Sequence, residues 1–162
     1  MRRFPVLSLV VAAMAVCFAE LAAAEDIGDQ EAALAEPVSL TIEQDSLERC
    51  VQALEKKVRA KRPEVAIKFA RQDLLLEGIT INQTVRDYEA IDRPAAEVLT
   101  NLLMRAFPGR PVKNSRDPEL KLIWVEGATP EDADMQVILI TTRDAAAKRG
   151  DKLPQVFRPL TK

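Results

Sequence analysis

The sequence predicts an α+β fold, in which a small mixed sheet carries two helices on one face in the order β-α-β-β-α-β-β. Residues 46–61 and 94–107 repeat apolar side chains at helical spacing, with polar side chains opposite them. Residues 120–125 and 135–142 are apolar at nearly every position, as strands covered on both faces are. Because helices and strands mix without the regular alternation of a doubly wound sheet, the α+β class is favoured.

The first strand is expected at residues 38–42, where apolar and polar side chains alternate. Asp45 and Glu48 fit a capping box, which predicts that the first helix begins here. Pro63 ends that helix, and residues 65–69 alternate again as a second strand. The apolar stripe of the helix comprises Leu47, Cys50, Val51, Leu54 and Val58.

The third strand is expected at residues 84–90, after a turn or bulge at Gly78. Its alternation breaks around Asp87 and Tyr88, and a bulge there would place Val85 and Tyr88 on one face. The second helix follows this strand directly. A strand–helix unit therefore occurs twice, without sequence identity between its two copies.

In the second helix, residues 94–107, Asp92 stands where a capping residue belongs, Pro94 suits the first turn and Pro108 ends the run. The opposite, polar side carries Glu97, Thr100, Asn101 and Arg105. The apolar stripe comprises Ala95, Val98, Leu99, Leu102, Leu103 and Ala106.

Residues 107–119 contain three prolines and show no periodicity, which predicts a long loop. The two strongly apolar strands follow, and the connection GATPEDAD predicts that they form a hairpin. Residues 145–149 are expected to form one helical turn that Gly150 closes. The end of the chain is expected to pack Leu153, Val156 and Phe157 onto the surface of the domain.

Residues 1–24 have the composition of a secretory signal peptide. Two arginines precede a nearly continuous apolar run, and Ala22-Ala23-Ala24 fits the small-residue pattern of a cleavage site. We therefore expect cleavage after Ala24 and a periplasmic or secreted protein with no membrane span. The alternative is that the segment is kept as a membrane anchor. A lipoprotein is disfavoured, because Val16 precedes Cys17 where a small residue is expected.

The rest of the chain is expected to hold one domain. Residues 25–36 are acidic and alanine-rich without periodicity, which predicts a flexible leader. The domain itself is assigned to residues 37–143, and residues 144–162 are assigned to a C-terminal extension packed on it. A chain of 162 residues with 48% hydrophobic content has enough apolar side chains for such a core.

The composition excludes several classes of function. A net charge of -2 does not indicate binding to nucleic acid. The chain has no histidine, which excludes a histidine base, a Ser-His or Cys-His nucleophile and an imidazole metal ligand. It also lacks phosphate-binding glycine loops and the nucleophile elbow. We therefore expect no enzyme, no cofactor and no metal.

Other reactive residues have plainer interpretations. Cys50 lies on the apolar stripe of its helix, so a buried small hydrophobe is favoured over a nucleophile. Trp124 alternates with apolar neighbours and is expected in the core. Glu131, Asp132 and Asp134 form an acidic cluster whose spacing matches no calcium loop, so a solvated turn is favoured over a calcium site.

Two basic groups are the candidate contacts for a partner. One lies in the proline-bearing loop and the other follows the last strand. They would form a contact surface for an anionic envelope partner, whether protein or polymer, although ordinary surface charge is the favoured interpretation. The candidate residues are Arg110, Lys113, Arg116, Arg143, Lys148 and Arg149.

Several motifs resemble the short N-terminal domain of secretins and TonB-dependent receptors. The resemblance covers residues 37–157. Its ending, ITTRDAAAKRGDKLPQVF, is similar to uncharacterised secreted proteins of planctomycete-type bacteria. The matching positions are Ser46, Leu47 and Leu54 in the first helix, Leu76, Gly78 and Ile79 around the turn, and Pro94, Ala95, Val98 and Leu99 in the second helix.

The resemblance implies a non-enzymatic periplasmic module that contacts other envelope proteins, here in a stand-alone form. Strand addition at an exposed sheet edge or contact through the basic loop would serve that function. The alternative is binding of an envelope glycan such as peptidoglycan, although aromatic content of 4% offers few stacking surfaces. An enzyme that uses a carboxylate pair such as Asp87 and Glu89 is least favoured. The oligomeric state stays open.

Overall fold

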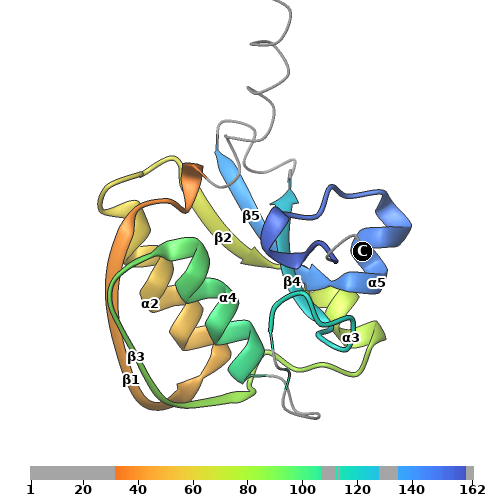
Figure 1. Cartoon of the computed structure of the whole chain (residues 1–162), viewed down its shortest axis with the longest axis horizontal. Coiled ribbons are helices and arrows are strands. Elements are labelled where there is room, and N and C mark those ends of the chain that lie inside the picture. The colour runs from red at the N-terminus through yellow and green to blue at the C-terminus, as the bar shows by residue number, and fades with distance from the viewer. Residues whose placement is uncertain (1–31, 107–111, 113, 128–134, 160–162) are drawn as a thin grey trace, which may run out of the picture.

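Two sheets enclose a pair of helices in this computed structural model, which describes residues 32–106, 112, 114–127 and 135–159 (Figure 1). A two-stranded antiparallel sheet pairs β1 (Pro37–Ser46) with β3 (Thr84–Pro94). A three-stranded sheet has the order β2-β5-β4, in which β5 runs parallel to β2 and antiparallel to β4. Its strands are β2 (Val65–Phe69), β4 (Leu122–Gly127) and β5 (Gln136–Thr142).

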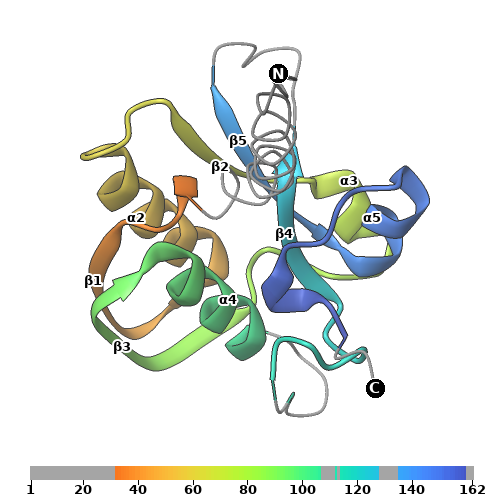
Figure 2. The same cartoon turned by 45° about the horizontal axis from the view of Figure 1, so that its top comes forward.

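The two long helices, α2 (Leu47–Arg59) and α4 (Ala95–Arg105), lie side by side between these sheets. Strands β1 and β3 curve around their outer side, and the three-stranded sheet lies on the other side (Figure 2). The short helices α3 (Arg71–Leu76) and α5 (Arg143–Arg149) lie across the three-stranded sheet from α2 and α4. A 3-10 turn, η2 (Gln155–Phe157), is the last element of the described chain.

The α+β class and the predicted order of strands and long helices are confirmed. The mixed sheet with two helices on one face corresponds to β2-β5-β4. The structure adds a second sheet, because α2 and α4 separate β1 and β3 from the other strands. It also adds α3, which the sequence analysis did not identify, just before the predicted turn at Gly78, where φ is 67°.

The predicted cap of α2 is wrong by one residue. Ser46, not Asp45, is the N-cap, and its hydroxyl accepts a hydrogen bond from the amide of Arg49 at 3.3 Å. The carboxylate of Asp45 instead accepts the amide of Ser46 itself at 2.8 Å. The side chain of an N-cap residue reaches the third amide of the helix, and Ser46 is the residue at that spacing from Arg49.

The hydrogen-bond ladder of β1 and β3 continues beyond both strands into the first turns of α2 and α4. The amide nitrogens at a helix start have no acceptor within their own helix. Here, the segment that precedes each strand supplies carbonyl acceptors for the helix of the other strand–helix unit. The bonds run from Leu47 to Gln83 (2.7 Å), Glu48 to Ile81 (3.1 Å), Ala95 to Glu36 (2.9 Å) and Ala96 to Leu34 (2.9 Å).

This arrangement corrects two expectations, one about where the folded chain begins and one about which residue caps α4. Residues 32–36 belong to the folded body, since Ala33 and Leu34 are fully buried, whereas the flexible leader was expected to extend to residue 36. Helix α4 has no side-chain cap, so Asp92 does not cap it. Asp92 lies in β3 with φ of 51°, and its amide donates to the Ser39 hydroxyl at 3.0 Å.

The predicted bulge in β3 is also displaced. Asp87 has φ of 48°, yet the pairing register is the same on both sides of it, and the exposed pair Glu43 and Gln44 of β1 lies opposite this break in alternation. The register shift lies between Val38 and Leu40. Val85 and Tyr88 are both buried, as the sequence predicts.

The C-terminal strands agree with the sequence analysis, and the extension packs more deeply than the predicted surface position. Strands β4 and β5 are antiparallel neighbours, although the acidic cluster Glu131, Asp132 and Asp134 lies outside the described residues. Gly150 closes α5 with φ of 76°. Phe157 is fully buried and packs edge-on against Trp124, with ring centroids 5.7 Å apart. The extension is thus part of the hydrophobic core.

We expect Leu102→Ala to lower the free energy of unfolding by about 2–5 kcal/mol, because Leu102 is fully buried and the substitution leaves a cavity. Leu76→Ala is the matched control. Leu76 is 82% exposed, so its loss should change stability by no more than about 0.5 kcal/mol. Denaturant unfolding of both variants measures the difference, and equal effects would contradict this packing.

Candidate functional site

A groove of about 630 Å³ lies along the outward side of α4. Four segments build its walls: residues 34–35, α4, residues 114–115 and Val156. Most of the lining is apolar, and Glu97 is the one charged residue among the described lining residues. Ligand sites in proteins have this composition, with a few polar groups that fix orientation.

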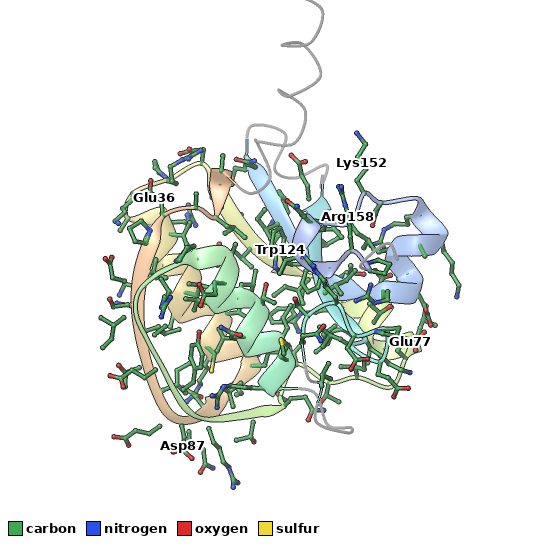
Figure 3. All side chains as sticks on the ribbon, viewed as in Figure 1. Glu36, Glu77, Asp87, Trp124, Lys152 and Arg158 are labelled. Atoms are coloured by element: carbon green, nitrogen blue, oxygen red, sulfur yellow. The ribbon has the colours of Figure 1, made fainter. Side chains whose placement is uncertain are left out.

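Trp124 lies beneath the groove, covered by other side chains, and is held in a fixed orientation. Its indole nitrogen donates to the hydroxyl of Thr100 at 3.0 Å, and that hydroxyl donates to the carbonyl of Ala96 at 2.7 Å. Figure 3 shows Trp124 in the interior of the molecule, and it is fully buried, as the sequence predicts. The hydrogen-bonding groups of Trp124 and Thr100 are therefore satisfied before any ligand binds.

The wall opposite α4 consists of two segments that bind each other. The hydroxyl of Ser115 donates to the carbonyl of Val156 at 2.7 Å. Arg143 joins the same segments, because its guanidinium donates to the carbonyls of Leu120 at 3.2 Å, Phe157 at 3.1 Å and Ser115 at 3.4 Å. Burial lowers the pKa of Arg143. Arg143 therefore fixes the C-terminal extension as a wall of the groove.

A second hollow of about 310 Å³ adjoins the groove, and Glu97 and Asn101 line both. It lies between α4 and β3, where Tyr88 packs beneath the guanidinium of Arg105 at 5.3 Å from the ring centroid. Burial raises the pKa of Tyr88, and the carboxylate of Glu97 raises it further, although a hydrogen bond with Asn101 opposes both. Arg105 and Arg93 lower the pKa of Tyr88, so charges of both signs act at this hollow.

Four of the six predicted partner-binding residues lie in the described part of the chain, and they have different environments. Arg110 and Lys113 lie outside the described residues. Arg116 is half-buried, and Lys148 is exposed on α5. Arg143 and Arg149 are engaged within the fold. Contact with a partner through these residues stays a prediction, but a structural role accounts for two of them.

Arg149 connects α5 to α3. Its guanidinium pairs with Asp73 and Asp151, and it also donates to the hydroxyl of Thr141 at 3.1 Å. Thr141 in turn donates to Asp73 at 2.6 Å. Burial opposes ionisation of Asp73, but the hydrogen bonds from Thr141 and Arg149 outweigh it and hold the pKa of Asp73 below its usual value.

The residues considered for catalysis are one buried cysteine and two exposed carboxylates. Cys50 is 1% exposed, and burial raises the pKa of its thiol to about 11, so the thiol is protonated at neutral pH. Asp87 and Glu89 are exposed on β3, and only Glu89 lines the second hollow. Within the described ranges, no three His, Cys, Asp or Glu residues lie close enough to hold a metal ion.

Comparison of the chain with protein-family models, with curated proteins and with solved structures finds no match. The resemblance to secretin and TonB-receptor N-terminal domains therefore stays a prediction. None of the helices that the structure describes has the length and hydropathy of a membrane-spanning segment. Residues 1–24, for which a signal peptide is predicted, lie outside the described residues.

Sequence reasoning placed Glu97, Thr100 and Asn101 on the polar side of their helix but did not identify them as lining residues of a groove. One signal was available. Ala96 lies beside Thr100 at the edge of that polar side, and its small side chain lines the groove. The remaining walls come from distant segments that no local pattern connects.

We expect Arg143→Gln to lower the free energy of unfolding by about 1.5–3 kcal/mol, since it removes charged hydrogen bonds to carbonyls of two segments. Lys148→Gln on the same helix is the control and should change stability by no more than about 0.5 kcal/mol. Thermal and denaturant unfolding measure both. If Arg143→Gln left the free energy of unfolding unchanged, the guanidinium would not be what holds the groove wall.

Proposed function

We propose that this protein is a non-catalytic interaction module of the periplasm or cell envelope, and that its groove binds an apolar segment of an envelope protein. The observation that carries the proposal is the groove on α4. Its walls come from four segments, hydrogen bonds hold two of them together, and its lining is mostly apolar. A preformed hollow of this kind reduces the ordering cost of binding.

Two sequence features support the cellular part of the proposal. The first 24 residues have the pattern of a cleaved export signal. The resemblance to secretin and TonB-receptor N-terminal domains implies a role in contacting envelope proteins. Cys50 supports the non-catalytic part of the proposal. Its thiol is buried and its pKa is raised, which agrees with a structural role and not with that of a nucleophile.

A protein segment is favoured over an envelope glycan such as peptidoglycan. Sugar rings stack on exposed aromatic faces, but Trp124 is fully buried and Tyr88 is 6% exposed. The described lining of the groove includes no other aromatic residue. The groove instead offers aliphatic surface at Met104 and Val156, which are only partly buried, and this suits apolar amino-acid side chains.

Site-specific photo-crosslinking in intact cells tests the proposal. A photoreactive residue at Met104, in the groove, should crosslink to a defined envelope protein. The same residue at Thr41, exposed on β1 and outside the groove, is the control and should not give that product. Filling the groove with Ala96→Phe should abolish the product because the segment loses its space.

Two further variants distinguish the loss of groove space from misfolding of the protein. Ala35→Phe fills the groove from an exposed position, and Ala147→Phe adds the same ring at an exposed position on α5 outside the groove. The crosslink should disappear in the first and persist in the second. The proposed function would be contradicted if the crosslink persisted in both Ala96→Phe and Ala35→Phe. It would also be contradicted if the photoreactive residue at Thr41 gave the same product as the one at Met104.

A further inference from the structure

The second hollow lies along an edge of the two-stranded sheet. Four successive residues of β3, from Tyr88 to Ile91, line it together with Glu97 and Asn101 of α4. Side chains alternate between the two faces of a strand, so a hollow on one face would contact every second residue. Contact with four residues in a row therefore places this hollow beside the strand, at the edge that does not pair with β1. Figure 2 shows β3 on the α4 side of the sheet and β1 on the α2 side.

Hydrogen bonds at one end of the sheet show which main-chain groups of β1 point toward β3. The carbonyl of Glu36 accepts the amide of Ala95, directly after β3, at 2.9 Å. The carbonyl of the next residue, Pro37, points away from β3 and accepts the ammonium group of Lys61 at 3.0 Å. Main-chain groups of successive strand residues point in opposite directions. Every second residue of β1 from Glu36 onward therefore bonds to β3.

This alternation determines which groups of β3 point outward. Leu40 and Ile42 belong to the set that bonds to β3, and their partners in the register are Ala90 and Tyr88. Glu89 lies between these two bonded pairs, so its N–H and C=O point away from β1. The outer edge of β3 thus presents the amide and the carbonyl of Glu89 to the hollow.

The outer edge is interrupted on both sides of this open stretch. Before it, the guanidinium of Arg105 donates to the carbonyls of Arg86 and Asp87, both at 3.3 Å. After it, Asp92 has φ of 51°, which ends the regular strand geometry. Among the described residues, no hydrogen bond outside the ladder reaches the main chain of Glu89. The chain therefore satisfies the neighbouring outward carbonyls and leaves this part of the edge open.

An open strand edge favours another strand over other ligands, because its donors and acceptors match those of an extended chain. Ile91, on this edge, is 68% exposed, and strands favour isoleucine, whereas edges protected against pairing carry lysine or proline. The hollow of about 310 Å³ gives space for side chains of an added strand. Glu97 and Arg93 both line it, so net charge does not select the occupant.

We propose that the outer edge of β3 binds an extended segment of a protein partner, which adds to the sheet as a third strand antiparallel to β3. The N–H and C=O of one segment residue bond to those of Glu89, and its two neighbours place their side chains in the hollow. A second copy paired about Glu89 would bring two carboxylates directly opposite each other, which is destabilising. The inference goes beyond the proposed function, because it uses a strand edge and not the apolar groove.

Native-state hydrogen exchange of the free protein tests whether the edge is open. We expect the amide of Glu89 to exchange about tenfold faster, or more, than those of Tyr88 and Ala90, which lie in the ladder. Equal protection of the three amides would show that the outward amide is already bonded and would overturn the inference.

Selection of a random 12-residue peptide library on the purified protein tests the occupant. We expect peptides that slow the exchange of the Glu89 amide about tenfold or more and that still bind Ala35→Phe, in which the groove is filled. N-methylation along such a peptide should then act with a period of two. Methylation of the residue that pairs with Glu89 should weaken binding about tenfold, whereas methylation of either neighbour, whose amide points away, should have little effect.

Proline substitutions test the same edge from the side of the protein. Glu89→Pro removes the outward amide without removing a ladder bond, as proline does at strand edges, and should abolish binding of these peptides. Thr41→Pro is the matched control, because Thr41 lies opposite Glu89 and its amide points outward from β1. Glu89→Ala keeps the main chain and should bind as the unmodified protein does. If Glu89→Pro does not fold, the methylation pattern still decides.

The remaining outcomes separate this inference from the proposed function. The inference would be overturned if no selected peptide protected the Glu89 amide, if methylation showed no alternation, or if folded Glu89→Pro bound normally. Loss of binding in Glu89→Ala would assign recognition to the carboxylate, and loss in Ala35→Phe would assign the peptides to the groove; both would also overturn it. Self-association that protects the same amide would assign the edge to a second copy. None of these results changes the crosslink expected from Met104.

Discussion

The hydrogen-bond ladder between β1 and β3 determines the rest of the structure, because it does not stop where the strands stop. At each end, it passes into the first turn of a helix, where two amides donate to the segment before the opposite strand. Amides at a helix start need acceptors from outside the helix. The two strand–helix units therefore complete each other, and neither helix start is satisfied in this way without the other unit.

This reciprocal pairing also explains where the groove lies. The carbonyls of Leu34 and Glu36 fix the N-terminal segment against the start of α4, and the same segment becomes one wall of the groove. The opposite wall depends on Arg143 and on the packing of Phe157 against Trp124. A segment near the start of the described chain and one near its end thus meet across α4. The proposed binding function depends on both being held in place.

The spacing of apolar residues predicted which side chains of a single helix or strand are buried. The apolar stripe of α4 predicted the burial of Leu102 and Leu103, and the strongly apolar strands predicted the interior position of Trp124 and Ile138. Thr100 was assigned to the polar side, but it is 4% exposed because Trp124 covers it. That burial depends on a strand elsewhere in the chain, which helical spacing cannot reveal.

The site was less predictable for the same physical reason. Backbone carbonyls cap α2 and α4, and every residue type has one, so no side chain marks the capping segments. Arg143 resembled surface charge in the sequence, whereas its role depends on three carbonyls that only the folded chain brings together. Glu97 was visible as a polar residue, but its place between two hollows required the positions of β3 and the C-terminal extension.

Native-state hydrogen exchange of four amides tests the central claim most directly. Amides in the first turn of a helix ordinarily exchange quickly, because they lack a partner in their own helix. The reciprocal ladder predicts that those of Leu47, Glu48, Ala95 and Ala96 are protected as strongly as amides in the middle of the β1–β3 pairing. Exchange of these four at the rate of unprotected amides would contradict the account.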